Sequence, residues 1–200
     1  MESFIIIRKF ALLKFQREFL ILDFQTQNVL FTVKEDKLTW AQKILRILNI
    51  SEVSFRFHVV STDHSICSSF HKGFTFLTSK TIFSDSNSNT QAILKRVLSR
   101  RDNIKYILEM PKENCTYHLP FDTSTGNYQI IDDNHKVIAT IIRDSPEVSQ
   151  LRKTFSTTDH RWHSIYVINF SDALLNHSLK QNLFAPVSIC MELLYLDQLE

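Results

Sequence analysis

Many short stretches of this chain are rich in β-branched and aromatic residues, and where apolar and polar residues alternate they have the pattern of β-strands with one buried face. The alternation is clearest over residues 53–60. Other stretches of similar length predict strands at 4–8, 18–24, 29–33, 43–48, 74–83, 104–110, 116–121, 128–131, 136–142 and 162–170. Residues 91–98 fit either a strand or one helical turn, and their apolar spacing matches the helical period better. Residues 61–71 are polar and predict a loop.

The turns between these strands have few glycines to use, since the chain has 2 Gly and 4 Pro among its 200 residues. Tight hairpin turns favour glycine because their central residues adopt positive φ angles. Asn, Asp and Ser also support turns. They stand at Asn49, at residues 85–87 and at residues 132–134, and we expect turns there.

The C-terminal stretch, residues 183–200, has a different pattern. From Val187 onward, apolar residues occupy every side of a helical wheel, with only Ser188 and Glu192 polar before Tyr195. A helix that is apolar on all sides must be buried in protein or lipid. A helix over residues 183–195 extends roughly 20 Å, less than the ~30 Å core of a bilayer. We therefore expect the hydrophobic plug of a soluble fold rather than a membrane span.

Eleven or twelve strands followed by this helix predict a mainly β protein, a closed antiparallel barrel around a central C-terminal helix. Closure removes exposed strand edges. A barrel of about twelve strands has an interior too wide for the side chains of its wall to fill, and the terminal helix is the segment that can fill it. Shorter helical segments are expected at 146–155, with Ser145 as N-cap, and at 173–183.

Composition places the chain among ordinary globular domains. An apolar fraction of 44% excludes global disorder, and 200 residues suit a single domain over residues 1–200. A net charge of +2 argues against a dedicated nucleic-acid binder. Three cysteines are too few for a disulfide scaffold and suit a reducing compartment. The apolar run at residues 4–7 is too short for a signal peptide, so we expect a cytoplasmic protein that can lie at the membrane periphery. We also expect a monomer without a transmembrane span.

Two segments share one strand–turn–strand design. Residues 18–33 form a strand, an aspartate, a turn and a second strand around Asp23, and residues 128–141 repeat this unit around Asp132. A strand with a tyrosine, Tyr166, then precedes the apolar terminal helix. In these features the chain resembles the tubby C-terminal-like superfamily, which includes the LURP-one-related proteins and the phospholipid scramblases. The resemblance implies a twelve-stranded barrel around a central helix. It also implies a lipid-related role, because tubby-like members bind phosphoinositides and scramblases are associated with lipid movement.

The densest basic cluster comprises Lys95, Arg96, Arg100, Arg101 and Lys105. On the edge of a strand–turn–strand unit, these side chains would present cations to lipid phosphates, each worth about 1 kcal/mol near an anionic membrane. The alternative is an ordinary solvated face. We take this cluster as the predicted lipid-binding site.

Other candidate chemistry is weaker. His58, His64, Cys67 and His71 have side chains that suit zinc, but their spacing matches no compact finger. We therefore expect no metal site and no cofactor. Neither a Gly-x-Ser-x-Gly nor a His-Glu-x-x-His motif is present, and 2 glycines exclude a Gly-rich nucleotide loop. No catalytic residues are predicted, and we expect a protein that is not an enzyme.

Glu192 is the most interesting single acid, because it interrupts the apolar plug. A buried carboxylate must be paired, hydrogen-bonded or neutral. A position at the barrel mouth would avoid the cost of burial, and we favour that position.

The expected function is peripheral binding of anionic lipids or phosphoinositides, with the headgroups as partners. The first alternative is a structural or scaffolding subunit that docks on a protein partner through loops or strand edges. The second is a scramblase-like protein, which would need membrane insertion.

Overall fold

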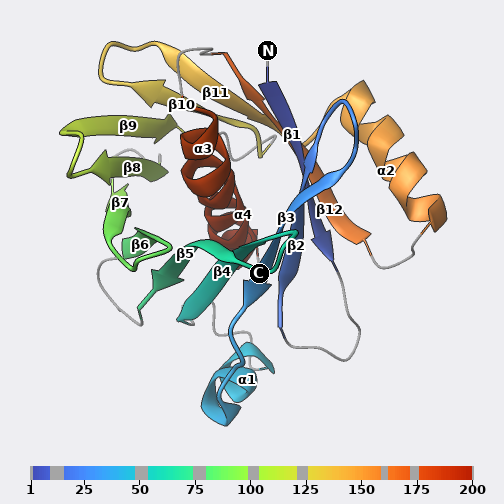
Figure 1. Ribbon diagram of the computed structural model, residues 1–200, viewed down its shortest axis with the longest axis horizontal. Helices are drawn as coiled ribbons and strands as arrows, with labels where there is room; N and C mark the ends of the chain where they lie inside the picture. The colour runs from blue at the N-terminus through green and yellow to red at the C-terminus, as the bar shows by residue number, and fades with distance from the viewer. Residues whose placement is uncertain are drawn as a thin grey trace.

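The chain forms a closed barrel of twelve antiparallel strands around a central helix (Figure 1). The computed structural model describes residues 2–9, 16–47, 54–73, 80–98, 104–120, 126–158, 162–171 and 176–199. The strands are β1 (Glu2–Lys9), β2 (Glu18–Asp23), β3 (Val29–Glu35), β4 (Phe55–Ser61), β5 (Ile66–Lys72), β6 (Lys80–Asp85), β7 (Thr90–Leu98), β8 (Ile104–Met110), β9 (Cys115–Pro120), β10 (Tyr128–Asp132), β11 (Val137–Ile142) and β12 (Trp162–Phe170). Each strand pairs with its neighbours in sequence, and β1 closes the barrel by pairing with β12. The predicted fold class is confirmed.

The C-terminal helix fills the barrel, as its pattern predicts. It begins with α3 (His177–Leu179), continues as a π-helical segment, η1 (Lys180–Phe184), and ends with α4 (Ala185–Leu199). Every side chain from Leu183 to Leu194 is buried. The inward side chains of the strands pack on this helix in one large core. No helix within the described residues is long and apolar enough to cross a membrane.

Some strands are apolar on both faces because a second helix covers the outside of the wall. Helix α2 (Pro146–Thr158) lies outside β12 and β1 in Figure 1. Its Leu151 and Phe155 pack on a second core that includes Ile5 and Leu20. Its first turn is capped by Ser145, whose Oγ accepts a hydrogen bond from the backbone N–H of Val148 at 3.1 Å. The run at residues 4–7 therefore does not alternate because both of its faces are buried.

Two sequence predictions about individual elements are wrong. Residues 43–48, predicted as a strand, belong to α1 (Trp40–Ile47) as far as Ile47. A reciprocal capping box starts this helix: Thr39 N–H donates to Gln42 Oε1 at 2.9 Å, and Gln42 N–H donates to Thr39 Oγ1 at 3.3 Å. Residues 66–71 of the predicted loop at 61–71 belong to strand β5. This polar strand is satisfied inside the barrel, because Ser68 Oγ donates to the carbonyl of Asn182 in the plug at 2.9 Å.

Residues 91–98, whose spacing favoured a helix, are a strand within β7. The closed barrel overrides their local apolar period, because β7 pairs along its length with both β6 and β8.

In two hairpin turns that lack glycine, aspartate side chains accept hydrogen bonds from backbone N–H groups. Asp85 Oδ1 accepts hydrogen bonds from the backbone N–H groups of Asn87 and Asn89, and Ser88 between them has a φ of 65°. Asp132 makes the same turn with Asn134 and Lys136. The predicted turns at 85–87 and 132–134 are thus present, whereas Asn49 lies outside the described residues.

Candidate functional site: a cationic pocket beside helix α1

The barrel wall divides the basic cluster that the sequence predicts. Arg96 follows the inward parity of Ala92 and Leu94 on β7, whereas Lys95 and Lys105 lie on the outer face. Arg96 Nε is buried and has no hydrogen-bond partner among the described residues. Arg100 and Arg101 lie outside the described residues. The structure therefore does not bring the three described members together on one surface.

The two outward lysines differ in their availability. Lys95 Nζ lies 2.5 Å from both carboxylate oxygens of Glu109, so its charge is largely neutralised. Lys105 is exposed, and no described residue forms a hydrogen bond or ion pair with its side chain. Lipid binding by this cluster stays a prediction, with Lys105 as its available described cation.

A second cationic site, which the sequence did not predict, lies at the end of the barrel where β3 and β5 end and β4 begins. A pocket of about 320 Å³ opens there beside the start of α1. Its charged and titratable lining residues are Glu35, Asp36, Lys37, Arg56, His71 and Lys72. Gly73 lies at its edge, and a Cβ atom built on this glycine meets no heavy atom within 4 Å. We call this the α1 pocket.

Strand register assembles the pocket from residues that are distant in sequence. Phe55 pairs with Lys72 across β4 and β5, while Glu35 pairs with Phe57 across β3 and β4. The backbone N–H of Asp36 donates to the carbonyl of Arg56 at 2.9 Å, which holds the segment leading to α1 against the start of β4.

Both acids of the α1 pocket are already engaged. Glu35 is buried, and its Oε2 accepts a hydrogen bond from the backbone N–H of Arg17 at 2.9 Å. Asp36 Oδ1 lies 2.9 Å from His58 Nε2. Each carboxylate therefore has a hydrogen-bond or ion-pair partner other than the cations of the pocket.

The cations of the α1 pocket lack such partners. Among the described residues, the side chains of Lys37, Arg56 and Lys72 form no hydrogen bond or ion pair. Lys72 is only 5% exposed, and its inward position on β5 aims it into the end of the barrel. A buried cation without a counter-ion is unfavourable, so this pocket is suited to an anion.

His71 adds a neutral hydrogen-bonding group to the pocket. Burial, followed by the nearby Arg56 guanidinium, lowers the pKa of His71 below its ordinary value. The ring is therefore neutral at pH 7, with one nitrogen to donate and one to accept. It can bind the protonated or the ionised oxygen of a phosphate.

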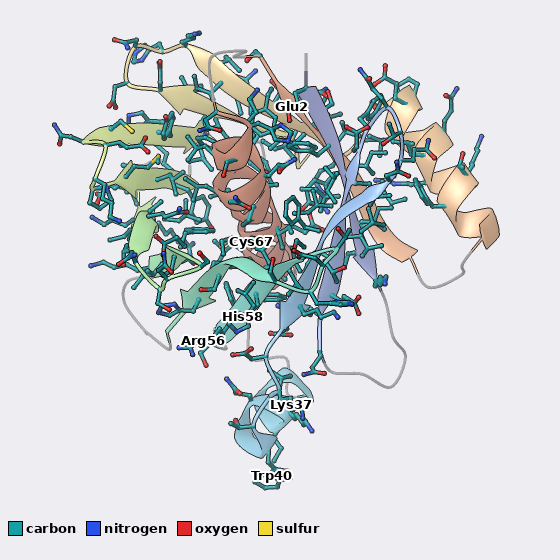
Figure 2. All side chains as sticks on the ribbon, viewed as in Figure 1. Glu2, Lys37, Trp40, Arg56, His58 and Cys67 are labelled. Atoms are coloured by element: carbon teal, nitrogen blue, oxygen red, sulfur yellow. The ribbon has the colours of Figure 1, made fainter. Side chains whose placement is uncertain are left out.

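Helix α1 projects from this end of the barrel and presents a tryptophan. Figure 2 shows Trp40 at the tip of the projection, with Lys37 between it and the barrel wall and Arg56 at the edge of the barrel. Trp40 is 78% exposed. Tryptophan side chains are enriched at membrane–water interfaces, where the ring is apolar and the N–H remains wet.

The other predicted sites take ordinary roles. His58 pairs with Asp36, and His64 lies in the turn after β4 with a φ of 67°. Within the described parts of the chain, no three His, Cys, Asp or Glu side chains are grouped to hold a metal ion.

Glu192 lies near the end of the barrel, and it is buried there with a partner. Its Oε1 lies 3.0 Å from Arg143 Nη2 and accepts a hydrogen bond from Ser164 Oγ at 3.1 Å. The side chain of Glu192 is almost fully buried. Burial raises the pKa of Glu192, and Arg143 opposes that rise. This acid therefore has a structural partner and does not belong to the α1 pocket.

Sequence reasoning missed the α1 pocket because its cations are spread along the chain. The one local signal was Thr39-x-x-Gln42, whose capping box indicates that Trp40 begins a helix. No protein-family model, curated protein or solved structure matches this chain. What the α1 pocket can bind therefore follows from its own side chains.

Proposed function

We propose that this protein is a non-enzymatic, peripheral binder of anionic phospholipids, and that the α1 pocket receives the phosphate of a lipid headgroup. The observation that carries the proposal is Lys72, a buried cation with no ion-pair partner among the described residues, in a pocket whose two acids already have other partners. A phosphate oxygen would supply the missing charge.

The charge at the mouth of the α1 pocket supports the same ligand. Lys37 and Arg56 are exposed and line the same pocket as Lys72, and near an anionic membrane each such residue contributes about 1 kcal/mol. A phosphoinositide, with several phosphates on one headgroup, would contact more of these cations than a lipid with a single phosphate. The resemblance to tubby-like proteins implies the same class of lipid.

The exposed Trp40 suggests which end of the barrel faces the membrane. With α1 toward the membrane, its ring would enter the interface while Lys37 and Arg56 face the headgroups. The C-terminal part of the plug helix would then lie at the membrane-facing end of the barrel, because Glu192 of α4 lies at the same end as the α1 pocket.

The test is co-sedimentation of the purified chain with vesicles of phosphatidylcholine, with and without a phosphoinositide, at low and high salt. Lys72→Met keeps the aliphatic length of the side chain and removes its charge. Gly73→Glu adds a carboxylate at the edge of the pocket, where a Cβ atom meets nothing. Lys112→Glu, in the exposed turn after β8, is the matched charge control.

We expect salt-sensitive binding that requires the phosphoinositide. Lys72→Met should weaken it about 5-fold, the effect of roughly 1 kcal/mol, and Gly73→Glu should weaken it further. Lys112→Glu should have little effect. If Lys105→Glu abolishes binding while both pocket variants bind normally, the site is the cluster that the sequence predicted. If the chain sediments with no vesicle, the scaffold alternative gains and the lipid proposal is wrong.

A further inference from the structure

A groove on the outer wall of the barrel is separate from the α1 pocket. It has a volume of about 380 Å³ and crosses the outer faces of β7, β8 and β9 toward β10. Its outward apolar side chains are Val97, Ile107, Pro120 and Ile131. We call it the wall groove.

The wall groove leaves apolar surface uncovered. Val97 is 38% exposed, and Ile107 and Ile131 are partly exposed. On the other side of the barrel, the outward apolar residues of β1 and β2 are covered by α2. Figure 1 shows α2 against β12 and α1 below the barrel, and no described helix lies over β8 and β9. Within the described part of the chain, no helix covers the apolar wall of the groove.

Among the described residues around the groove, Lys105 is the cation whose charge has no partner. Glu109 is bound by Lys95 at 2.5 Å. Asp133 lies 3.3 Å from His118 and accepts a hydrogen bond from Thr116 N–H. Lys105, which lines the groove, is exposed and has no partner among the described residues.

We infer that the wall groove binds a long-chain carboxylate, with the hydrocarbon chain over Ile107 and the carboxylate on Lys105. The complement of an apolar groove with one free cation is a ligand with one apolar chain and one negative charge. The volume falls within the usual 300–1,000 Å³ range of small-ligand sites. A neutral lipid would leave Lys105 unused, and a ligand with several charges would leave the apolar walls uncovered.

This inference does not depend on the membrane proposal, and its test uses no membrane. The purified full chain is titrated with a dansyl-labelled undecanoate, which is then displaced by palmitate or by methyl palmitate. Lys105→Met removes the charge, and Ile107→Asp places a carboxylate among the apolar walls. Lys112→Met is the matched control, and urea unfolding of each variant checks that the barrel is intact.

We expect palmitate to displace the probe. Lys105→Met should weaken palmitate about tenfold, the effect of losing one charge-assisted hydrogen bond, and should leave methyl palmitate unchanged. Ile107→Asp should weaken both ligands, whereas Lys112→Met and Gly73→Glu should weaken neither. Because Gly73 belongs to the α1 pocket, failure of the membrane proposal leaves these expectations unchanged.

Three results would overturn the inference. The first is no displacement by palmitate up to its solubility limit. The second is an equal loss of acid and ester affinity in Lys105→Met, which would remove the role of the charge. The third is a wild-type dimer by light scattering that Ile107→Asp converts to a monomer, because the groove would then be covered by a second copy of the chain.

Discussion

Arg143 and Glu192 join the barrel wall to its plug: Arg143 Nη2 lies 3.0 Å from Glu192 Oε1, just beyond the end of β11. A second ion pair stands at the opposite end of the barrel, where Lys180 Nζ of η1 lies 2.8 Å from Glu2 Oε2 of β1. Between them, Tyr128 Oη donates to the carbonyl of Ser188 at 3.2 Å. Apolar packing alone allows a helix to slide or rotate, whereas these polar contacts set the position of the plug along the barrel.

The first prediction concerns the ion pair between Arg143 and Glu192. Arg143→Met leaves the Glu192 carboxylate buried without its cation, so the free energy of unfolding should fall by about 3 kcal/mol or more. Urea unfolding followed by circular dichroism measures this change. The double variant Arg143→Met with Glu192→Leu should recover most of the loss, because no charge is then left buried. A loss below about 1 kcal/mol in the single variant would mean that the pair contributes little.

The second prediction concerns the plug itself. Met191 is fully buried against the inside of the wall, so Met191→Ala should reduce the free energy of unfolding by about 2–5 kcal/mol. Deletion of residues 183–200 should leave an insoluble barrel, since its inward side chains would lose the helix on which they pack. A truncated chain that stays soluble and unfolds cooperatively would contradict this prediction.

The third prediction concerns acid pH and the turn after β4. Hydrogen bonds from the Ser61 hydroxyl and from the N–H and hydroxyl of Ser65 lower the pKa of Asp63 from 3.8 to about 2. A carboxylate with a lowered pKa in the folded state stabilises the fold above its unfolded pKa and loses that effect as the pH falls. The stability advantage of the wild type over Asp63→Asn should therefore be full above about pH 5 and shrink as the pH falls toward 2.

Urea midpoints of both proteins, measured at intervals from pH 6 to pH 2.5 or so, follow this difference. A constant difference across the range would show that the Asp63 carboxylate is not hydrogen-bonded as described.

The fourth prediction concerns Trp40. Because its side chain is 78% exposed, Trp40→Ala should change the urea midpoint little while weakening vesicle binding. The chain has 2 tryptophans, so Trp162→Phe leaves Trp40 as the single reporter. Its fluorescence should shift to shorter wavelength when phosphoinositide vesicles are added, as the ring leaves water. An unshifted spectrum with the protein bound to vesicles would place α1 away from the membrane.

The sequence predicted strands best where burial is regular. The limits of β8 and β12 agree with the predicted strands at 104–110 and 162–170, where most of the apolar residues are buried in the inner core or under α2. Strand β5 was missed because polar side chains do not reveal a partner that is distant in sequence. Its Ser68 is satisfied by Asn182, 114 residues away.

The predicted binding cluster shows a second case in which sequence order did not indicate which side chains lie together. Lys95 and Arg96 are adjacent in sequence, but neighbouring residues of a strand point to opposite faces. The sequence prediction therefore placed Lys95 and Arg96 on one surface, whereas the barrel wall separates their side chains.

The sequence by itself determined the architecture: many short strands and a terminal helix that is apolar on every side leave few ways to bury that helix other than inside a closed barrel. The tertiary structure decided where the chemistry lies. Strand register pairs inward Lys72 of β5 with Phe55 and outward Arg56 of β4 with His71, and both cations line the pocket at the end of the barrel with Lys37, while the two nearby acids have other partners. The free charge of a site depends on which side chains meet, and that is a property of pairing across the sheet rather than of order along the chain.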